Sequence, residues 1–248
     1  MSFKVVFHDD LEFFLKTGSG VKREFNCMRF SPLKDVIESM GIPHTEVGII
    51  LVDRKEQDFS FLPASGQTID VFPLIPPVDI TRPTLLRPEP FERVSFVADV
   101  NVGKLARLLR VAGFDTAYRN SWNDSTIAAL AAEGSRIVLT KDRDLLKRRI
   151  IRYGRLIRAI RPWEQLEEVI HFFGLENMIQ PFRICPSCNV HLEKISKEDI
   201  LDRLEPLTRL FFDEFTICPS CKGIYWAGSH YGKVLRRLDR IRGEGFLH

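Results

Sequence analysis

The sequence predicts an α/β protein, in which a parallel sheet with helices on both faces lies between an N-terminal β-grasp domain and a C-terminal zinc-ribbon-like module. Three observations predict this arrangement. Apolar strands and amphipathic helices alternate over residues 94–174, which is typical of a parallel sheet. Six of the 14 prolines fall within residues 73–90 and mark a stiff linker. Two Cys-Pro-Ser-Cys pairs follow the alternating region.

Composition and charge favour a soluble chain of which one part meets a polyanion. Of the 248 residues, 44% are hydrophobic, and no apolar run approaches the roughly 20 residues that cross a bilayer. The first eight residues lack the pattern of a signal peptide, so we expect a cytoplasmic protein with no membrane partner. Residues 1–80 hold 8 Lys or Arg and 12 Asp or Glu, a net charge of −4, whereas the remainder carries +7. This division favours nucleic-acid binding by the C-terminal part.

Residues 1–75 hold the elements of a small β-grasp domain. Alternating Phe and Val residues predict the first two strands, and Gly18-Ser19-Gly20 predicts the turn between them. Ser31-Pro32 places proline at the first position of a helix. The expected elements are strands at 3–8 and 21–27, a helix from Pro32 to Gly41, a strand at 47–52 and a last strand that ends at Pro73.

The sequence at the end of this domain indicates which kind of β-grasp it resembles. The order of the elements, together with Gly-Gln-Thr-Ile-Asp-Val-Phe-Pro-Leu-Ile-Pro-Pro from Gly66 to Pro77, resembles the ubiquitin-like sulfur carriers. Those carriers act through a C-terminal Gly-Gly whose carboxylate is activated. Here Val78-Asp79 follows the prolines and the chain continues, so that chemistry is not available. We therefore expect either a module that docks a protein partner or a structural appendage.

Four strands and four helices are expected behind the linker. Ordinary signals bound the helices: glycines end three of them, Asn123-Asp124-Ser125 caps one, and Pro162 opens the last. The expected strands are 94–98, 114–118, 136–140 and 156–160, and the expected helices are 102–111, 123–134, a short helix holding Leu145 and Leu146, and 162–174.

Aspartates stand directly behind two of these strands. Asp99 follows the first strand, Asp142 and Asp144 follow the third, and Asp124 begins the helix behind the second. Because ligands bind at the carboxyl edge of parallel strands, these acids are expected to converge there. Converging carboxylates repel one another unless a cation lies between them, and oxygen ligands suit Mg²⁺ or Mn²⁺. In the alternative, each acid caps the helix that follows it.

Basic side chains crowd the stretch behind the third strand. Between Lys141 and Arg161 there are nine Lys or Arg and only two acids. This excess favours contact with RNA phosphates, and Lys141, Arg143, Arg148 and Arg149 are the candidates. The alternative is a solvated surface.

Four of the five cysteines form two identical pairs, Cys185/Cys188 and Cys218/Cys221, with 29 residues between them. Four thiolates are the ligand set of a tetrahedral structural Zn²⁺ site. The long gap is expected to hold a helical insert from Glu198 to Leu210. Redox-active thiols are the alternative.

Aromatic and basic residues interleave behind the second cysteine pair. Among them, Trp226 and His230 are candidates for contact with RNA, since aromatic rings stack on bases while Lys and Arg neutralise phosphates. In the alternative, the aromatic residues form the core of a small module.

A further resemblance rests on three stretches, Phe96–Arg110, Gly113–Thr116 and Leu139–Asp144. They resemble the Mut-seven C-terminal RNase domain family, a branch of the PIN-like nucleases. The likeness covers about residues 94–238, including both cysteine pairs, and the N-terminal domain resembles the ubiquitin-like module often joined to that family. The resemblance implies a PIN-like fold, single-stranded RNA as substrate, and a divalent-metal site at four acids: Asp99, Asp124, Asp142 and Asp144.

These observations predict a metal-dependent ribonuclease that hydrolyses single-stranded RNA with Mg²⁺ or Mn²⁺ and carries a structural Zn²⁺. Two alternatives stay open: a non-catalytic module that binds RNA on tRNA or ribosomes, and an adaptor that docks a protein through the ubiquitin-like domain. The expected division is a β-grasp domain at 1–75, a Pro-rich linker at 76–92, a PIN-like nuclease domain at 93–180 and a zinc-knuckle module with a basic aromatic tail at 181–248.

Overall fold

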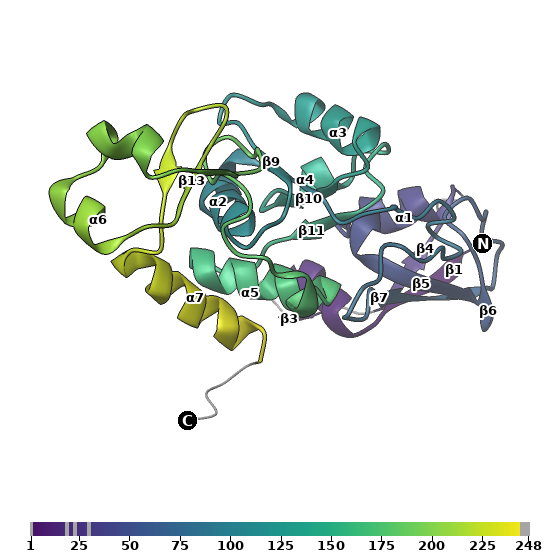
Figure 1. Ribbon diagram of the computed structural model, residues 1–248. Coiled ribbons are helices and arrows are strands. Elements are labelled where there is room, and N and C mark those ends of the chain that lie inside the picture. The colour runs from purple at the N-terminus through teal and green to yellow at the C-terminus, as the bar shows by residue number, and fades with distance from the viewer. Residues whose placement is uncertain (1, 18–19, 22–23, 29–30, 244–248) are drawn as a thin grey trace.

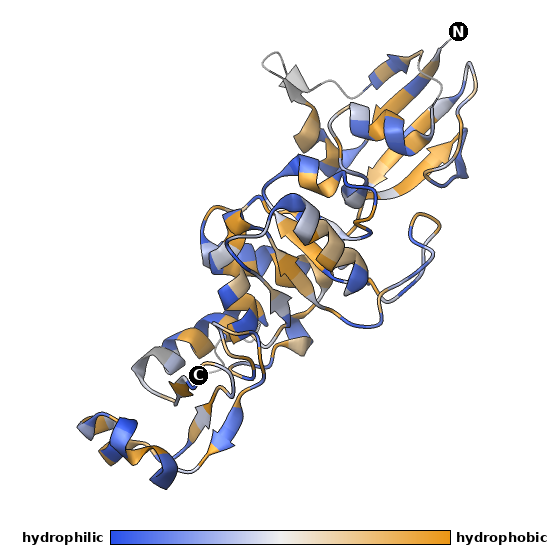
Figure 2. Cartoon of the chain, turned by 90° about the horizontal axis from the view of Figure 1, so that it is seen from above, coloured by the Kyte–Doolittle hydropathy of each residue, from blue (hydrophilic) through white to orange (hydrophobic). Residues whose placement is uncertain are grey.

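The chain forms three parts in a row: an N-terminal sheet, a central parallel sheet and a small cysteine module (Figures 1 and 2). The computed structural model describes residues 2–17, 20–21, 24–28 and 31–243. Gly18 and Ser19, at the turn expected between the first two strands, lie outside the described residues. Every helix in the described ranges is too short or too polar to cross a bilayer.

The N-terminal domain is a β-grasp, as its sequence predicts. Its mixed sheet has the order β4-β1-β7-β5-β6, in which β1 and β7 are parallel and all other neighbours are antiparallel. Helix α1 (Leu33–Ser39) buries Leu33, Val36 and Ile37 against this sheet. The strands are β1 (Phe3–Phe7), β4 (Glu24–Cys27), β5 (Val47–Val52), β6 (Lys55–Glu56) and β7 (Thr68–Pro73), with a 3-10 helix η2 (His44–Glu46) before β5.

The stretch after β1 differs from the prediction. A 3-10 helix, η1 (Asp9–Leu15), follows β1 and buries Leu11, Phe14 and Leu15. Of the strand expected at 21–27, Val21 lies in β3 (Gly20–Val21), which pairs with β2 (Lys16–Thr17), and residues 24–27 form β4. The alternation of aromatic residues and valines therefore predicted extended chain here, but it did not predict the pairing of β2 with β3.

The central part confirms the predicted α/β class. Its sheet is parallel throughout, in the order β11-β10-β8-β9. Residues alternate between two faces, so that Phe96 and Ile137 pack in one core with α2 and α5, whereas Val97 and Val138 pack in another with α3. The elements are β8 (Phe96–Ala98), η3 (Val100–Val102), α2 (Gly103–Val111), β9 (Thr116–Ala117), α3 (Asp124–Glu133), β10 (Ile137–Thr140), α4 (Arg143–Leu146), β11 (Gly154–Leu156) and α5 (Pro162–Phe173).

The fourth strand lies earlier than predicted. We expected residues 156–160, but β11 is Gly154–Leu156, paired with Val138–Thr140. A side chain at Gly154 would meet Leu146 at 2.5 Å, so glycine permits this close approach. After Ile157 donates to the Thr140 carbonyl at 2.7 Å, the chain leaves the sheet, and Ile160 is 83% exposed. The apolar run thus continues past the strand into a loop.

The C-terminal part builds a small antiparallel sheet beside the cysteines. Its order is β12 (Glu193–Ile195), β13 (Phe215–Ile217) and β14 (Ile224–Tyr225). The expected helical insert is broken into η5 (Glu198–Arg203) and α6 (Pro206–Phe211), because Pro206 cannot continue a helix from Glu205. The last helix, α7 (Ser229–Ile241), returns to the central core through Leu238 and Ile241. A 3-10 helix, η4 (Glu176–Met178), follows α5.

The N-terminal domain packs directly on the central sheet. Buried residues from the two parts, including Ile37 and Leu146, belong to one apolar cluster. The Glu46 carboxylate, 3% exposed, accepts from the Arg155 guanidinium and from the Leu156 amide, both at 2.7 Å. Arg87, from the proline-rich stretch, donates to the carbonyls of His44, Thr45, Val47 and Arg152. The proline-rich stretch is therefore part of the contact between the two parts.

We expect Glu46→Ala to lower the free energy of unfolding by about 2–3 kcal/mol, because it removes the hydrogen-bond acceptor of the buried Arg155 Nη1 and of the Leu156 amide. Urea unfolding measures the change. The matched control is Glu89→Ala, since Glu89 pairs with Arg152 but its side chain is 80% exposed, and we expect a loss below about 1 kcal/mol. Equal losses for the two variants would contradict the role of Glu46.

Candidate active site and cysteine cluster

The order of the central strands marks one place on the sheet edge. The chain moves from β8 to β9 on one side and then crosses to β10 on the other side of β8. The carboxyl ends of β8 and β10 therefore flank the point where the connections diverge, which is where open α/β sheets bind ligands. Asp99 follows β8 and Thr140 ends β10, so both lie at this point.

Asp99 is held rigidly. Its side chain is 5% exposed, and Oδ1 accepts from the backbone N–H of Val100 at 2.6 Å. Oδ2 accepts from the Thr140 hydroxyl at 2.7 Å and from the Asn101 side-chain amide. A buried carboxylate with three donors is fixed in one orientation before any ligand arrives.

Thr140 joins the two strand ends. Its hydroxyl donates to Asp99 and accepts from the backbone N–H of Asp142 at 2.9 Å. The Asn101 side-chain carbonyl accepts from the backbone N–H of Lys141 at 3.0 Å, which adds a second link. Sequence reasoning missed Thr140 and Asn101, although both are polar residues at strand ends beside the predicted acids.

The other predicted acids lie differently. Asp142 caps α4 through its contact with the Asp144 backbone N–H at 2.8 Å. The Asp144 side chain is 84% exposed and pairs with Lys147 at 3.0 Å. Asp124 is the first residue of α3, capped by Asn123, and pairs with Arg148 at 3.5 Å. The structure thus links Asp99 to Asp142 through Thr140 and gives Asp144 and Asp124 basic partners.

A hollow of about 510 Å³ opens beside Asp142. It lies between the two domains, because Gly41 from the N-terminal domain forms part of its wall. The other lining residues are Lys141, Asp142, Arg143, Asp144 and Lys147. Two predicted acids and two predicted phosphate-binding residues therefore share one open depression.

The basic run is not a single exposed surface. Six of its nine side chains pair with an acid, and two of these acids, Asp10 and Glu46, come from the N-terminal domain. The pairs are Lys147–Asp144, Arg148–Asp124, Arg152–Glu89, Arg155–Glu46, Arg158–Asp10 and Arg161–Glu164. The excess of positive charge seen in the sequence is thus largely matched by acids that are distant along the chain.

The remaining three basic residues of the run keep charge available at the surface. The Lys141 ammonium donates to the Ala159 carbonyl at 2.8 Å, and the Arg143 guanidinium lies over the Phe14 ring. Arg149 is exposed, and within the described residues its side chain has no hydrogen bond or ion pair. Of the four predicted phosphate-binding residues, only Arg148 is paired with a carboxylate.

The four cysteines come together as predicted. The sulfur atoms of Cys185, Cys188, Cys218 and Cys221 all lie within 4.8 Å of one another, which suits a tetrahedral metal ion. Among the described residues they are the only group of three or more His, Cys, Asp or Glu ligands this close. Burial raises the pKa of Cys185, but hydrogen bonds from the Tyr225 hydroxyl at 3.1 Å and from backbone amides outweigh it and lower the pKa to about 7. A lowered thiol pKa favours the thiolate that metals bind.

Trp226 lies in an apolar groove beside the cysteine module. The groove measures about 540 Å³, and its wall also includes Phe182, Phe215 and Tyr231. Trp226 is 38% exposed, so its ring can still be reached from solvent. His230 belongs to α7, but its side chain lies outside the described residues.

Polar contacts of Arg110, Asp115 and Thr116 fasten the cysteine module to the central sheet. The buried Arg110 guanidinium donates to the Pro186 and Ser187 carbonyls within the first cysteine pair, at 2.9 Å each. The Asp115 carboxylate accepts from Arg136 at 2.9 Å and from the Asn189 side chain at 2.6 Å. The module is therefore positioned by the same segment that forms β9.

We expect Asp115→Asn to lower the free energy of unfolding by about 1–2 kcal/mol at neutral pH, since the carboxylate is only one-third exposed. Burial raises the pKa of Asp115, but the hydrogen bonds from Arg136 and Asn189 outweigh it and leave the pKa below its ordinary value. A lowered carboxyl pKa stabilises the fold above the unfolded pKa of about 3.9, and this stability is lost as the pH falls through the folded pKa.

Melting temperatures between pH 7 and pH 3 check this prediction. The wild type should lose more stability than Asp115→Asn as the solution becomes acid. Asp213→Asn is the control, because Asp213 pairs with Lys197 but its side chain is 86% exposed. Parallel pH profiles for wild type and Asp115→Asn would contradict the assignment.

Fold and site together define an α/β protein with a buried acid at the sheet switch point, flanked by a ubiquitin-like domain and a four-cysteine module. The chain belongs to the family of the Mut7-C RNAse domain, whose model matches residues 94–238. The Mut7-C ubiquitin model matches residues 1–79. The family resemblance predicted from the sequence is therefore confirmed, and it supports a ribonuclease-type function. Neither curated proteins nor solved structures gave a match.

Proposed function

We propose that this chain is a metal-dependent endoribonuclease of the PIN-like type that hydrolyses single-stranded RNA at the carboxyl ends of β8 and β10. The observation that carries the proposal is the buried Asp99 carboxylate, fixed by Thr140 beside Asp142 at the switch point of a parallel sheet. A buried acid in this place is costly for folding and suited to binding a ligand.

The oxygens of this edge fit Mg²⁺ or Mn²⁺. Mg²⁺ is commonly held by one or two carboxylates, with water and substrate phosphate completing its shell. Asp99 and Asp142 would supply these carboxylates, and Asp144 and Asp124 would add further oxygens once released from Lys147 and Arg148. When bound, the ion activates water and stabilises charge on the phosphate.

The chain's own groups would position the reaction. Thr140 and Asn101 hold Asp99 in a single orientation, because both donate to Oδ2. Lys141 and Arg143 lie in the hollow beside Asp142 and can each neutralise an RNA phosphate. Arg148 and Arg149 extend the positive charge along the same segment.

A second basic surface supports a strand-shaped substrate. Lys141 contacts the Ala159 carbonyl, and this loop leads directly to Trp163 at the start of α5. The Arg237 guanidinium lies over the Trp163 ring at 5.0 Å, within a hollow of about 350 Å³. That hollow is also lined by Lys233, Arg236 and Arg240 of α7. A single strand can therefore follow positive charge from the acids to α7, and Trp226 and His230 would contact it further along.

The cysteine cluster would hold a structural Zn²⁺, and we propose domain limits at 1–75, 93–180 and 181–248 with a linker at 76–92.

A single observation favours a second candidate, an RNA-binding module without catalysis. Asp142 caps α4 and Asp99 caps η3, so both acids also have a purely structural use. Docking of a protein partner by the ubiquitin-like domain would then use the face that does not contact the central sheet.

The test is cleavage of a labelled single-stranded RNA by the full chain with Mg²⁺, with Mn²⁺ or without added metal. The Asp99→Asn/Asp142→Asn variant serves as comparison. Metal-dependent cutting that is lost in the variant supports the nuclease. Salt-sensitive RNA binding by both proteins, without cutting by either, would replace the nuclease with the binding module.

A further inference from the structure

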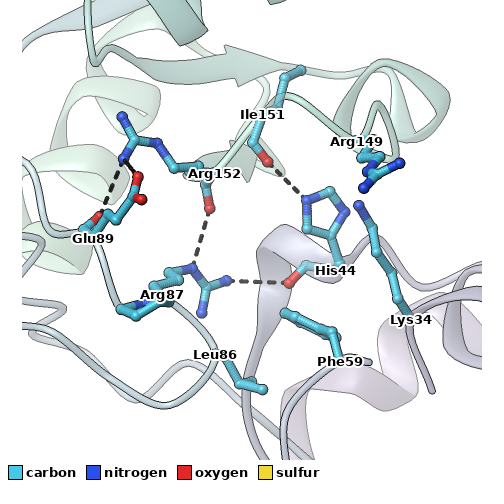
Figure 3. Close-up of a pocket in the computed structure, with 10 residues that line it drawn as sticks. Lys34, His44, Phe59, Leu86, Arg87, Glu89, Arg149, Ile151 and Arg152 are labelled. Atoms are coloured by element: carbon cyan, nitrogen blue, oxygen red, sulfur yellow. Dashed lines mark hydrogen bonds and ion pairs between the residues drawn. The ribbon is translucent and has the colours of Figure 1, made fainter. Parts of the chain in front are cut away.

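A separate hollow lies at the contact between the N-terminal domain and the central sheet (Figure 3). It measures about 260 Å³ and shares no lining residue with the hollow beside Asp142. Its wall combines one apolar side with several basic groups. The apolar side comprises Phe59, Leu86, Pro88 and Ile151, and the polar residues are Lys34, His44, Arg87, Glu89, Arg149 and Arg152.

Most charged groups of this hollow already have partners. The Glu38 carboxylate lies 2.6 Å from His44 Nδ1, while His44 Nε2 lies 2.7 Å from the Ile151 carbonyl. Arg152 pairs with Glu89 at 3.0 Å. The Glu38 and Glu89 carboxylates therefore each contact a basic side chain.

Lys34 and Arg149 are the exception. Their charged ends lie toward each other beside the His44 ring, one from each domain (Figure 3). Within the described residues, neither side chain has a hydrogen bond or an ion pair. Burial lowers the pKa of Lys34, the Glu38 carboxylate opposes this, and the Arg149 charge lowers the pKa further. The two facing cations repel each other, and an anionic ligand between them would remove that repulsion.

We propose that this hollow binds a phosphate monoester between the Lys34 ammonium and the Arg149 guanidinium. A phosphate monoester carries a charge of about −1.5 to −2 at neutral pH, which two cations neutralise, whereas a carboxylate carries only one charge. Guanidinium and ammonium groups are both phosphate donors, the first through two parallel hydrogen bonds. The ligand touches both domains and so ties the ubiquitin-like domain to the central sheet.

The apolar side of the hollow indicates what the phosphate is attached to. Phe59 and Leu86 offer a surface on which a base or a ribose can lie. The volume of about 260 Å³ lies just below the range of ligand pockets, roughly 300–1,000 Å³, so the hollow admits one nucleotide and not a continuous strand. The monoester belongs either to a free mononucleotide or to the phosphorylated end of an RNA, and the latter source rests on the proposed function.

The experiment is calorimetric titration of the full chain with AMP, with adenosine, and with a short oligoribonucleotide that carries either a 5′-phosphate or a 5′-hydroxyl. All titrations use the Asp99→Asn/Asp142→Asn variant without added divalent metal, so that the RNA is not cleaved. We expect AMP to bind and adenosine not to bind, with affinity reduced at least about tenfold in both Lys34→Ala and Arg149→Ala. Lys34→Arg should retain binding. Lys55→Ala and Arg82→Ala, which change exposed residues outside this hollow, are the controls.

The outcomes separate this proposal from the nuclease. Binding of AMP supports a free nucleotide, whereas binding of only the 5′-phosphorylated RNA supports an RNA end. Equal binding of AMP and adenosine, unchanged affinity in both alanine variants, or no binding of any phosphate-bearing probe overturns the proposal. Because binding is measured without cleavage, its result stands whether or not the chain cuts RNA.

Discussion

Asp99→Asn should reduce RNA cleavage by about 10³-fold or more while the protein stays folded. The variant removes the buried carboxylate that directly follows β8 at the sheet edge. A metal ion contributes several kcal/mol to stabilising charge in a phosphoryl transition state, and about 1.4 kcal/mol corresponds to a tenfold change in rate. Single-turnover cleavage of a labelled RNA in Mn²⁺ measures the loss, because it excludes effects on product release.

Two comparisons make this prediction specific. Asp144→Asn should lose less, about tenfold, because its side chain is 84% exposed and already paired with Lys147. Asp58→Asn is the matched control in the N-terminal domain, because among the described residues Asp58 forms hydrogen bonds only with its neighbours Ser60 and Phe61. Asp144→Asn and Asp58→Asn should both bind RNA as the wild type does. An Asp99→Asn protein that is folded and cuts RNA at the wild-type rate would contradict the proposed site.

The location of the proposed site follows from the sequence, because ligands bind at strand ends in parallel sheets. Asp99 and Asp142 both follow apolar runs of strand length, and the alternation of strands with helices places those ends on one edge. The link between them could not be predicted, since it depends on the side chain of Thr140 reaching from β10 to Asp99. That contact requires β8 and β10 to be direct neighbours, which the sequence does not specify.

The basic residues between Lys141 and Arg161 show a second limit of prediction from sequence. Local counting found nine basic residues and two acids, and it favoured an exposed phosphate-binding surface. Arg155 instead pairs with Glu46, which is 109 residues away, and Arg158 pairs with Asp10, which is 148 residues away. Charge matching between domains cannot be seen in a window of sequence.

The cysteine module was the easiest part to predict, and its packing explains why. Its own buried core consists of Ile200, Leu204 and Phe215, which is far too small to stabilise a fold without a cross-link. We therefore expect the fold of this module to depend on a cross-link through the four cysteines, whose two close pairs are visible in the sequence. The insert between the pairs packs little, so its division at Pro206 follows only from local backbone chemistry.

Cys185→Ser should abolish zinc binding and unfold the C-terminal module. The Cys185 sulfur is fully buried within the cluster, and structural zinc contributes about 10–16 kcal/mol in small domains, which the core around Phe215 cannot replace. We expect about one zinc ion per wild-type chain by elemental analysis and none in the variant. Limited proteolysis should then cut between residues 185 and 226, while the β-grasp domain stays intact.

Cys27→Ser is the matched control, since Cys27 lies in β4 of the N-terminal domain and outside the cluster. It should keep its zinc and its resistance to protease. Treatment of the wild type with a zinc chelator should reproduce the proteolysis of Cys185→Ser, because both remove the same cross-link. If chelation left the module protected and the isolated protein contained no zinc, the four thiols would be assigned as redox-active instead. The contacts of Arg110 and Asn189 give a further consequence: loss of the metal should also loosen β9, where these side chains meet Thr116 and Asp115.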